Sequence, residues 1–441
     1  MKKRRNMRNI SKVLVGALLC LAVSSCGIYG KYRSSAQTDE AIKINVPSYR
    51  EIFRDSMLLD LIDSALVRNY DLRMAQERVK QANAQLTAAR LAYLPRIYAG
   101  GNPVISVDPS KKFDAGALNY SLGTLSWEID IFGRVTNRKR IAKMVKQEME
   151  DLEQACRCEL VASVATLYYS LQNIDAQILA TDAAEQNWAS SVQTIKAMKQ
   201  AGIEDEAGVS QFEGSYYATR ASGKALRLLR EVNENAMRML LCESEGKIER
   251  GSITNINSAA LDTINLNAVR ARPDVRAAEM RLAQAFYNAN LARANCCPQI
   301  EIGGSIGWGN KSLIYGLIGG LLQPVFNAGE NIAQVKVGES RLEEYKMAYA
   351  NALLNAGNEV NNALATGRVR RSEREECLNR VEAMERALKA TQLKMKYGRG
   401  TYLEVLSAQN SLLEAQIADI QNACDILSSS VELYRALGGG R

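Results

Sequence analysis

The stretch DLRMAQERVKQANAQLTAARLAYLPRIYAGG, residues 71–101, decides the fold, because a related copy follows 203 residues later. The copy is DVRAAEMRLAQAFYNANLARANCCPQIEIGG, residues 274–304, and 12 of the 31 aligned positions are identical. Chance similarity between two Ala-rich helices does not explain why both copies end in Pro-x-Ile-x-x-Gly-Gly at the same offset. An internal duplication of a helix–strand–strand–helix unit is the simplest account.

Proline placement indicates long helices around these copies. Only seven prolines occur, none between Pro109 and Pro273 and none after Pro324. Proline is about 3 kcal/mol less favourable than alanine inside a helix, so proline-free tracts permit long helices. Apolar residues recur at steps of three and four within 141–178, and 330–397 is rich in Ala, Glu, Lys, Leu and Asn. We expect a helix of roughly 65 residues, about 100 Å long, in each tract.

Two β-hairpins are predicted where the helical pattern stops, at about 96–131 and 299–326. QIEIGGSIGWG, after Pro298, and TLSWEIDIF, at 124–132, alternate apolar and polar residues. That period of two is typical of a strand with one apolar face. The alternation assigns to the apolar face Ile129, Ile131, Ile300, Ile302 and Trp308, and to the polar face Glu128, Asp130, Glu301 and Ser305.

Four strands of one chain cannot close into a barrel. A sheet edge that is open to a lipid bilayer leaves backbone groups without hydrogen bonds, each at a cost of several kcal/mol. The strands are therefore either outside a bilayer or pooled with strands of other copies. Three copies would supply twelve strands, an even number that suits an outer-membrane barrel.

The N-terminal stretch LVGALLCLAVSSC, Leu14–Cys26, follows six Lys or Arg residues and predicts an export signal. Its apolar run is shorter than the roughly 20 residues of a transmembrane helix. Val23-Ser24-Ser25-Cys26 resembles a bacterial lipobox, whose cysteine is lipidated; the alternative is an ordinary signal with a chance cysteine. We expect a lipoprotein signal peptide over 1–25, a lipid-anchored linker over 26–48, a first repeat over 49–250 and a second over 251–441.

The composition excludes several functional classes. The formal charge of +8 falls to +2 without residues 1–25, because six basic and no acidic side chains are lost, so charge indicates no nucleic-acid partner. The chain has no histidine, which removes the commonest general base and metal ligand. Its nine cysteines include no CxxC spacing. We expect no metal site, no cofactor and no disulfide framework.

Six motifs carry a resemblance to a known family, and they follow one another along nearly the whole mature chain. They are ARLAYLPRI at 89–97, SWEIDIFGR at 126–134, RPDVRAAEMRLAQA at 272–285, PVFNAG at 324–329, YGRGTYLEVLSAQNSLLEAQ at 397–416 and LYRALGGG at 433–440. Each motif alone is weak. Together and in order they resemble the TolC-like outer membrane efflux family, and most of all its lipoprotein branch.

The resemblance implies a fold that is mostly α with a membrane β-barrel. A homotrimer with four strands per protomer would form the twelve-stranded barrel in the outer membrane, and a long α-helical barrel would project into the periplasm. Cys26 would anchor the N-terminus in outer-membrane lipid, and the apolar strand faces would meet lipid while the polar faces line the lumen. The implied function is a passive exit duct of a tripartite efflux system, whose partners are a periplasmic adaptor and an inner-membrane pump.

Two other functions compete with this hypothesis. One is the outer-membrane component of a protein-secretion system, or a helical scaffold of similar shape. The other is a hydrolytic surface lipoprotein that uses Glu128 and Asp130, which lie two residues apart and would share one face of a strand. A glycosidase additionally needs a cleft and a carboxyl group of raised pKa. The simpler interpretation is that Glu128 and Asp130 face a water-filled pore.

Turn residues predict where the long helices reverse direction. The segments KQAGIEDEAGVSQ at 199–211 and KYGRGTYLEVL at 396–406 carry the glycines that tight turns need. The resemblance adds docking of the adaptor at these ends, through Ala201, Gly202, Ile203, Gly398, Gly400 and Thr401. It also implies a periplasmic gate at Tyr402, Leu406, Ser407 and Asn410. The family commonly has Asp where Ser407 stands, and often Arg where Asn410 stands, so we expect a gate held by packing and neutral hydrogen bonds, unless Glu404 takes over the charge.

Overall fold

The computed structural model describes residues 29–33, 48–105, 118–251, 266–309, 312–322 and 328–439. The expected signal peptide over 1–25, Cys26 and the turns of both predicted β-hairpins lie outside these residues. The chain divides into two compact units, and each draws on both halves of the duplication. The sheet unit is built on 76–152 and 274–352, and the hairpin unit on 43–75, 153–273 and 353–441. The repeats over 49–250 and 251–441 are thus a division of the sequence, distinct from these two compact units.

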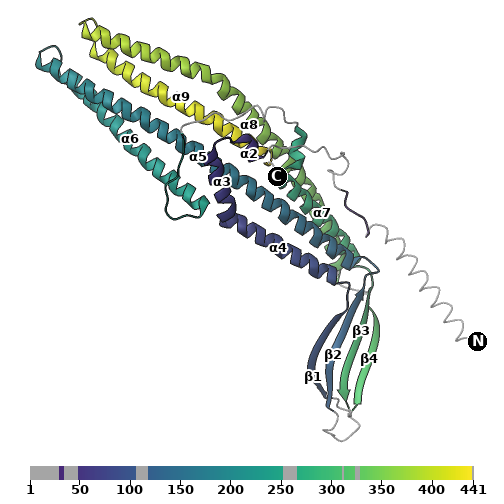
Figure 1. Ribbon diagram of the computed structural model, residues 1–441. Coiled ribbons are helices and arrows are strands. Elements are labelled where there is room, and N and C mark those ends of the chain that lie inside the picture. The colour runs from purple at the N-terminus through teal and green to yellow at the C-terminus, as the bar shows by residue number, and fades with distance from the viewer. Residues whose placement is uncertain are drawn as a thin grey trace, which may run out of the picture. The chain divides into compact units, whose positions relative to one another are not determined.

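The duplication is visible in the bounds of the helices (Figure 1). Helices α4 (Tyr70–Leu91) and α7 (Pro273–Ala294) are offset by 203 residues at both ends. Helices α5 (Arg134–Gln200) and α8 (Glu330–Lys396) have 67 residues each and are offset by 196. Helices α6 (Glu206–Leu241) and α9 (Tyr402–Ala436) begin at the same offset of 196. Both the duplication and the two long helices predicted from the sequence are confirmed.

The sheet unit contains four antiparallel strands in the order β1-β2-β3-β4 (Figure 1). They are β1 (Arg96–Ile105), β2 (Leu118–Ile129), β3 (Gln299–Gly309) and β4 (Ser312–Leu322). The pairing of β2 with β3 joins the two repeats. In that pairing Trp127 lies opposite Ile302, and Glu128 lies opposite Glu301. Along β2 and β3, apolar residues therefore share one face of the sheet and polar residues the other, because cross-strand partners point to the same side.

One part of the predicted alternation is wrong, because β2 ends at Ile129. Asp130 and Ile131 lie in the turn that leads to α5. The Asp130 carboxylate accepts hydrogen bonds from the backbone N–H of Val135 at 3.0 Å and of Thr136 at 2.8 Å. Asp130 thus satisfies the unpaired donors at the start of α5 and lines no strand face.

The hairpin unit is held by an aromatic core near the short helices α2 (Tyr49–Ile52) and α3 (Ser56–Arg68). Phe53 is fully buried, and its ring centroid lies 5.9 Å from that of Tyr434 on α9. Asp55 accepts from the N–H of Met57 to cap α3, and also from the Tyr168 hydroxyl of α5 at 2.5 Å. A short 3₁₀ helix, Leu266–Ala271, leads into the second repeat.

The described helices have no segment of the length and apolar character that crossing a membrane requires. Helices α5 and α8 are each about 100 Å long at roughly 1.5 Å per residue, and both carry charged residues throughout. Each of these two helices ends in a reversal of the chain, at Gly202 and at Gly398.

Candidate functional site

The two helical hairpins of the hairpin unit end in equivalent turns. Gly202 follows α5 with φ +71°, and Gly398 follows α8 with φ +68°. The N–H of Gly202 bonds to the carbonyl of Lys199 and that of Ile203 to Met198, at 3.0 and 2.9 Å. The second turn repeats this pattern, with distances of 3.0 and 2.9 Å for the N–H groups of Gly398 and Arg399. Both turns are Schellman-type ends in which glycine supplies the left-handed conformation.

The sequence suggested that Gly400, like the other turn glycines, supplies a left-handed conformation, but the structure shows a different reason for glycine at this position. Its φ is not in the left-handed region, unlike that of Gly398. A Cβ at position 400 would lie 2.9 Å from the Cβ of Lys394 and 3.2 Å from the backbone N of Met395. Glycine is therefore required because the chain passes close to the end of α8.

The residues assigned to adaptor docking are largely exposed. Ala201, Gly202, Gly398 and Thr401 are exposed, Gly400 is half-buried, and Ile203 has 67% of its surface accessible. Tyr397, beside Gly398, is 73% exposed. The sequence analysis did not include it, although an aromatic residue next to a turn glycine can indicate an exposed contact residue. The two turns thus offer one large apolar side chain each.

An apolar cluster joins the ends of the two hairpins, and we call it the tip cluster. Its buried members are Trp188 and Ile195 of α5 and Val209 and Phe212 of α6; Met395 of α8 and Tyr402 and Leu406 of α9 pack against them. The Phe212 ring centroid lies 5.7 Å from that of Trp188 and 6.4 Å from that of Tyr402. The start of α9 is therefore fastened to the α5–α6 hairpin of its own chain.

The four residues assigned to the gate separate into two pairs. Tyr402 and Leu406 are half-buried in the tip cluster, one helical turn apart, whereas Ser407 and Asn410 are exposed. Gln409, the neighbour of Asn410 in the sequence, is only 6% exposed and donates from Nε2 to the Ser191 hydroxyl of α5 at 2.9 Å. Sequence reasoning missed this contact, which spans 218 residues.

Ion pairs fasten α5 to α6 close to their shared turn. Lys196 pairs with Glu213 at 2.6 Å, and Lys199 pairs with Glu206. Farther along, Arg227 binds both carboxylate oxygens of Asp182 at 2.7 and 2.8 Å. Each pair is exposed, and exposed ion pairs contribute little to stability, so the tip cluster is the main contact that holds the end of the hairpin.

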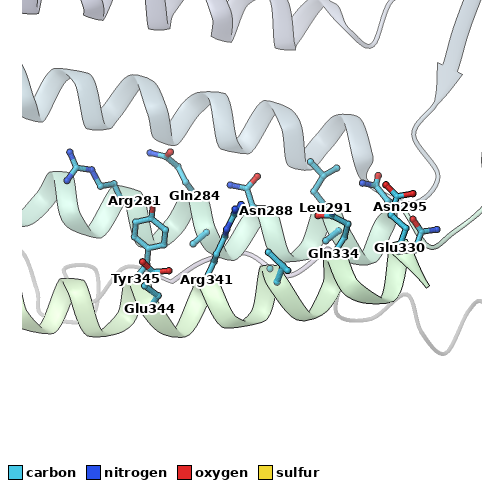
Figure 2. Close-up of a pocket in the computed structure, with 15 residues that line it drawn as sticks. Arg281, Gln284, Asn288, Leu291, Asn295, Glu330, Gln334, Arg341, Glu344 and Tyr345 are labelled. Atoms are coloured by element: carbon cyan, nitrogen blue, oxygen red, sulfur yellow. The ribbon is translucent and has the colours of Figure 1, made fainter. Parts of the chain in front are cut away.

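A polar groove of about 830 Å³ runs between α7 and the first part of α8 in the sheet unit. Figure 2 shows Arg341 of α8 reaching toward Asn288 of α7. Gln284 instead donates from Nε2 to the Glu148 carboxylate of α5 at 2.6 Å. The two helices approach each other closely at Gly338, where a Cβ would lie 3.2 Å from the Cα of Ala289. The groove offers hydrogen-bonding groups of both kinds along two helices.

The carboxylates of the hydrolytic alternative are both engaged in structural contacts. Glu128 Oε1 lies 3.1 Å from the Arg134 guanidinium, and Asp130 caps α5 as described. Among the described residues no three His, Cys, Asp or Glu side chains gather as a metal site would require, and none of the seven described cysteines forms a disulfide. Burial raises the pKa of the Cys424 thiol above its ordinary value.

The geometry can be compared with known proteins. The sequence profile described as outer membrane efflux protein matches residues 61–243 and 267–439. The chain belongs to this family. The two matched blocks fall on the two halves of the duplication, so the family signature includes both helical hairpins and both turns.

Relatives of this family are similar over most of their length. Cation efflux system protein CusC of Escherichia coli (strain K12) is 28% identical over 418 residues, covering 89% of this chain and 88% of the relative. Probable outer membrane lipoprotein SilC of Salmonella typhimurium is 26% identical over 420 residues, with 89% and 88% covered. Solvent efflux pump outer membrane protein SrpC of Pseudomonas putida is 26% identical over 425 residues, with 91% and 89% covered.

Solved structures share the fold. The CusC crystal structure, described in terms of folding and transmembrane channel formation, has a TM-score of 0.81 at 26% identity, covering 89% of this chain and 95% of that chain. The outer-membrane channel OprN has a TM-score of 0.85 at 22% identity, with 94% and 99% covered, and shows the fold alone. The predicted fold class is confirmed.

Proposed function

We propose that this protein is the outer-membrane exit duct of a tripartite efflux system. Membership of the outer membrane efflux family and similarity to efflux channels along 89% of the chain support this function. The observation that carries it is the four-stranded sheet, whose central strands β2 and β3 have one apolar face and whose edge strands have no partner among the described residues, together with two 67-residue helices that end in matching turns. The duct is passive, and the energy for export comes from the pump.

Three copies assemble into the working channel in this proposal. The edge strands β1 and β4 carry unpaired backbone groups, and pairing β4 of one copy with β1 of the next would close a twelve-stranded barrel. Two exposed apolar side chains of α8, Ile332 at 65% and Met347 at 71%, would be available for contact with a neighbouring copy.

The turn ends of the hairpins would bind the periplasmic adaptor. The two turns present the exposed side chain of Ile203 and the backbone at Gly202, Gly398 and Gly400, and small residues allow another helical hairpin to approach closely. Ile203→Glu changes the exposed side chain of the first turn and leaves the turn glycines in place, so it should lower export while the oligomer still forms. Normal export by this variant would contradict docking at this turn.

The gate would be formed by exposed residues at the start of α9. Ser407 and Asn410 are free to meet their counterparts in other copies, whereas Tyr402 and Leu406 hold α9 in place from behind. Cys26 would carry the lipid that sorts the protein to the outer membrane, with the helices in the periplasm.

Single-channel conductance combined with native mass tests the central proposal. The purified protein should have the mass of a trimer and conduct ions in a planar bilayer. In cells, deletion of the gene should lower export of the cargo of its pump, and the wild-type gene should restore it. A monomer without pore activity would reject the duct.

A further inference from the structure

Residues 29–33, called the strap below, lie across the point where β2 passes into α5. The edge of the Tyr29 ring faces Gly133, where a Cβ would lie 3.1 Å from Tyr29 Cε1. The Tyr29 hydroxyl donates to the carbonyl of Ile131 in the same turn. Arg140, two turns into α5, donates from Nη1 to the carbonyl of Gly30 at 3.1 Å. One end of the strap is thus fixed to both sides of the turn.

The other end of the strap is fixed to α7. The backbone N–H of Tyr32 donates to the Tyr287 hydroxyl at 3.2 Å, and the Tyr32 ring lies 6.0 Å from that of Phe286. Arg140 connects the two ends, because its guanidinium also lies 5.5 Å from the centroid of the Tyr287 ring. The strap therefore ties the β2–α5 turn to a helix of the other repeat.

The duplication supplies an internal comparison for this turn. Gly133 and Gly329 occupy equivalent positions before α5 and α8, with φ of +71° and +79°. In each case the glycine carbonyl accepts the first helical hydrogen bond, at 2.8 Å from Asn137 N and at 2.9 Å from Ala333 N. No described atom outside the immediate chain neighbours lies within 4 Å of a Cβ built at Gly329, whereas Tyr29 covers Gly133. The two turns share a backbone conformation, and among the described residues only the turn at Gly133 is covered by another segment.

The covered and uncovered turns follow different kinds of strand. The covered turn follows β2, which has a neighbour on both sides, and the uncovered turn precedes α8 and follows β4, which is an edge strand. We propose that the strap clamps the β2–α5 turn and so fixes the middle of the sheet on its helices, while the uncovered turn at Gly329 leaves β4 free to adjust as it pairs with another copy. The assembly part of this inference rests on the proposed function.

The clamp also determines where an N-terminal membrane anchor would be held. Cys26 precedes Tyr29 by three residues, and three residues span at most roughly 11 Å. A lipid on Cys26 would therefore be tethered beside the clamped turn.

Hydrogen exchange of the full-length protein in detergent tests the clamp. The variant Tyr29→Ala/Tyr32→Ala removes the side-chain contacts of the strap and leaves the backbone groups of Gly30 and Tyr32 in place. The matched control is Lys31→Ala/Arg33→Ala, which truncates two exposed side chains of the same segment. In the first variant, the amides of 134–140 should exchange roughly five- to thirty-fold faster, the range for loss of one or two kcal/mol of local stability. The amides of 330–336 and the control should be unchanged.

Two outcomes would overturn the clamp: unchanged exchange at 134–140, or equal acceleration at both turns. Tyr29→Phe keeps the ring and loses only the hydroxyl, so amide exchange at 134–140 should accelerate less than in the double variant. This variant also tests the clamp if the double variant does not fold. Native mass then tests the assembly step. The strap variant should yield fewer oligomers than the control, and an equal yield would overturn the link between the clamp and assembly. The exchange result does not depend on transport, so a failure of the efflux proposal would be recognised separately.

Discussion

Replacing Phe212 with alanine should detach the start of α9 from the α5–α6 hairpin. Phe212 is 1% exposed and stands between Trp188 and Tyr402, so it links the two hairpins. Burial of a phenylalanine removes about 150 Å² or more from water, which at about 25 cal/mol per Å² gives roughly 4 kcal/mol. Core Phe→Ala substitutions cost about 3–5 kcal/mol, in agreement with that figure. The loss exceeds what the exposed ion pairs near the turn contribute.

The local effect can be measured by hydrogen exchange at 402–410 and by leak conductance of the isolated oligomer. Both should rise in Phe212→Ala, while Leu403→Ala, which truncates a 56% exposed neighbour of Tyr402, should leave both unchanged. A double-mutant cycle between Phe212 and Tyr402 should give a coupling of about 0.5–1.5 kcal/mol for the ring pair. Exchange at 402–410 that is the same in Phe212→Ala and Leu403→Ala would refute the role of the tip cluster.

Three further predictions concern titration, the gate and the sheet. Burial raises the pKa of Tyr168 and of Tyr434. The folded protein holds these protons more tightly than the unfolded chain, so the free energy of unfolding should fall as pH rises above about 10. Melting curves at alkaline pH should show this fall, and the fall should be weaker in Tyr168→Phe. Leak conductance corrected for bulk conductivity should be nearly insensitive to salt and to pH between about 5 and 8, because apolar packing and neutral side chains hold the gate; a steep salt-dependent opening that Glu404→Gln abolishes would contradict this. Lysine at Ile302 should destabilise the membrane-inserted barrel by about 2–4 kcal/mol and lysine at Glu301 much less, and equal losses in denaturant titrations would reverse the assignment of the sheet faces.

Local patterns predicted the elements of this fold well. The proline-free tracts located α5 and α8, and the duplication located α4, α7 and the strands that follow them. The period of two continued through Asp130 and Ile131, where the chain had already left β2. Alternation alone does not show where a strand ends, because the end is set by the helix donors that Asp130 satisfies.

The candidate site was predicted less completely, because its contacts are non-local. Tyr402 and Leu406 are four residues apart, which places them on one side of a helix but does not tell whether their partner belongs to the same copy. The structure supplies that partner as Phe212 and its neighbours. The bond from Gln409 to Ser191 joins residues 218 apart, and neither residue type indicates the other.

The equal lengths of α5 and α8 restrict how this protein can change in evolution or by design. The offset between the repeats drops from 203 residues at α4 and α7 to 196 at α5 and α8, so the difference of seven residues lies in the strands and turns. If α5 gained seven residues between 153 and 188, and the facing part of α6 also gained seven, the first turn would lie about 10 Å beyond the second. Phe212 would then pass Tyr402, and the two hairpins would end at different depths. Insertions can therefore accumulate freely between the strands, whereas a longer or shorter duct requires matched changes in both repeats.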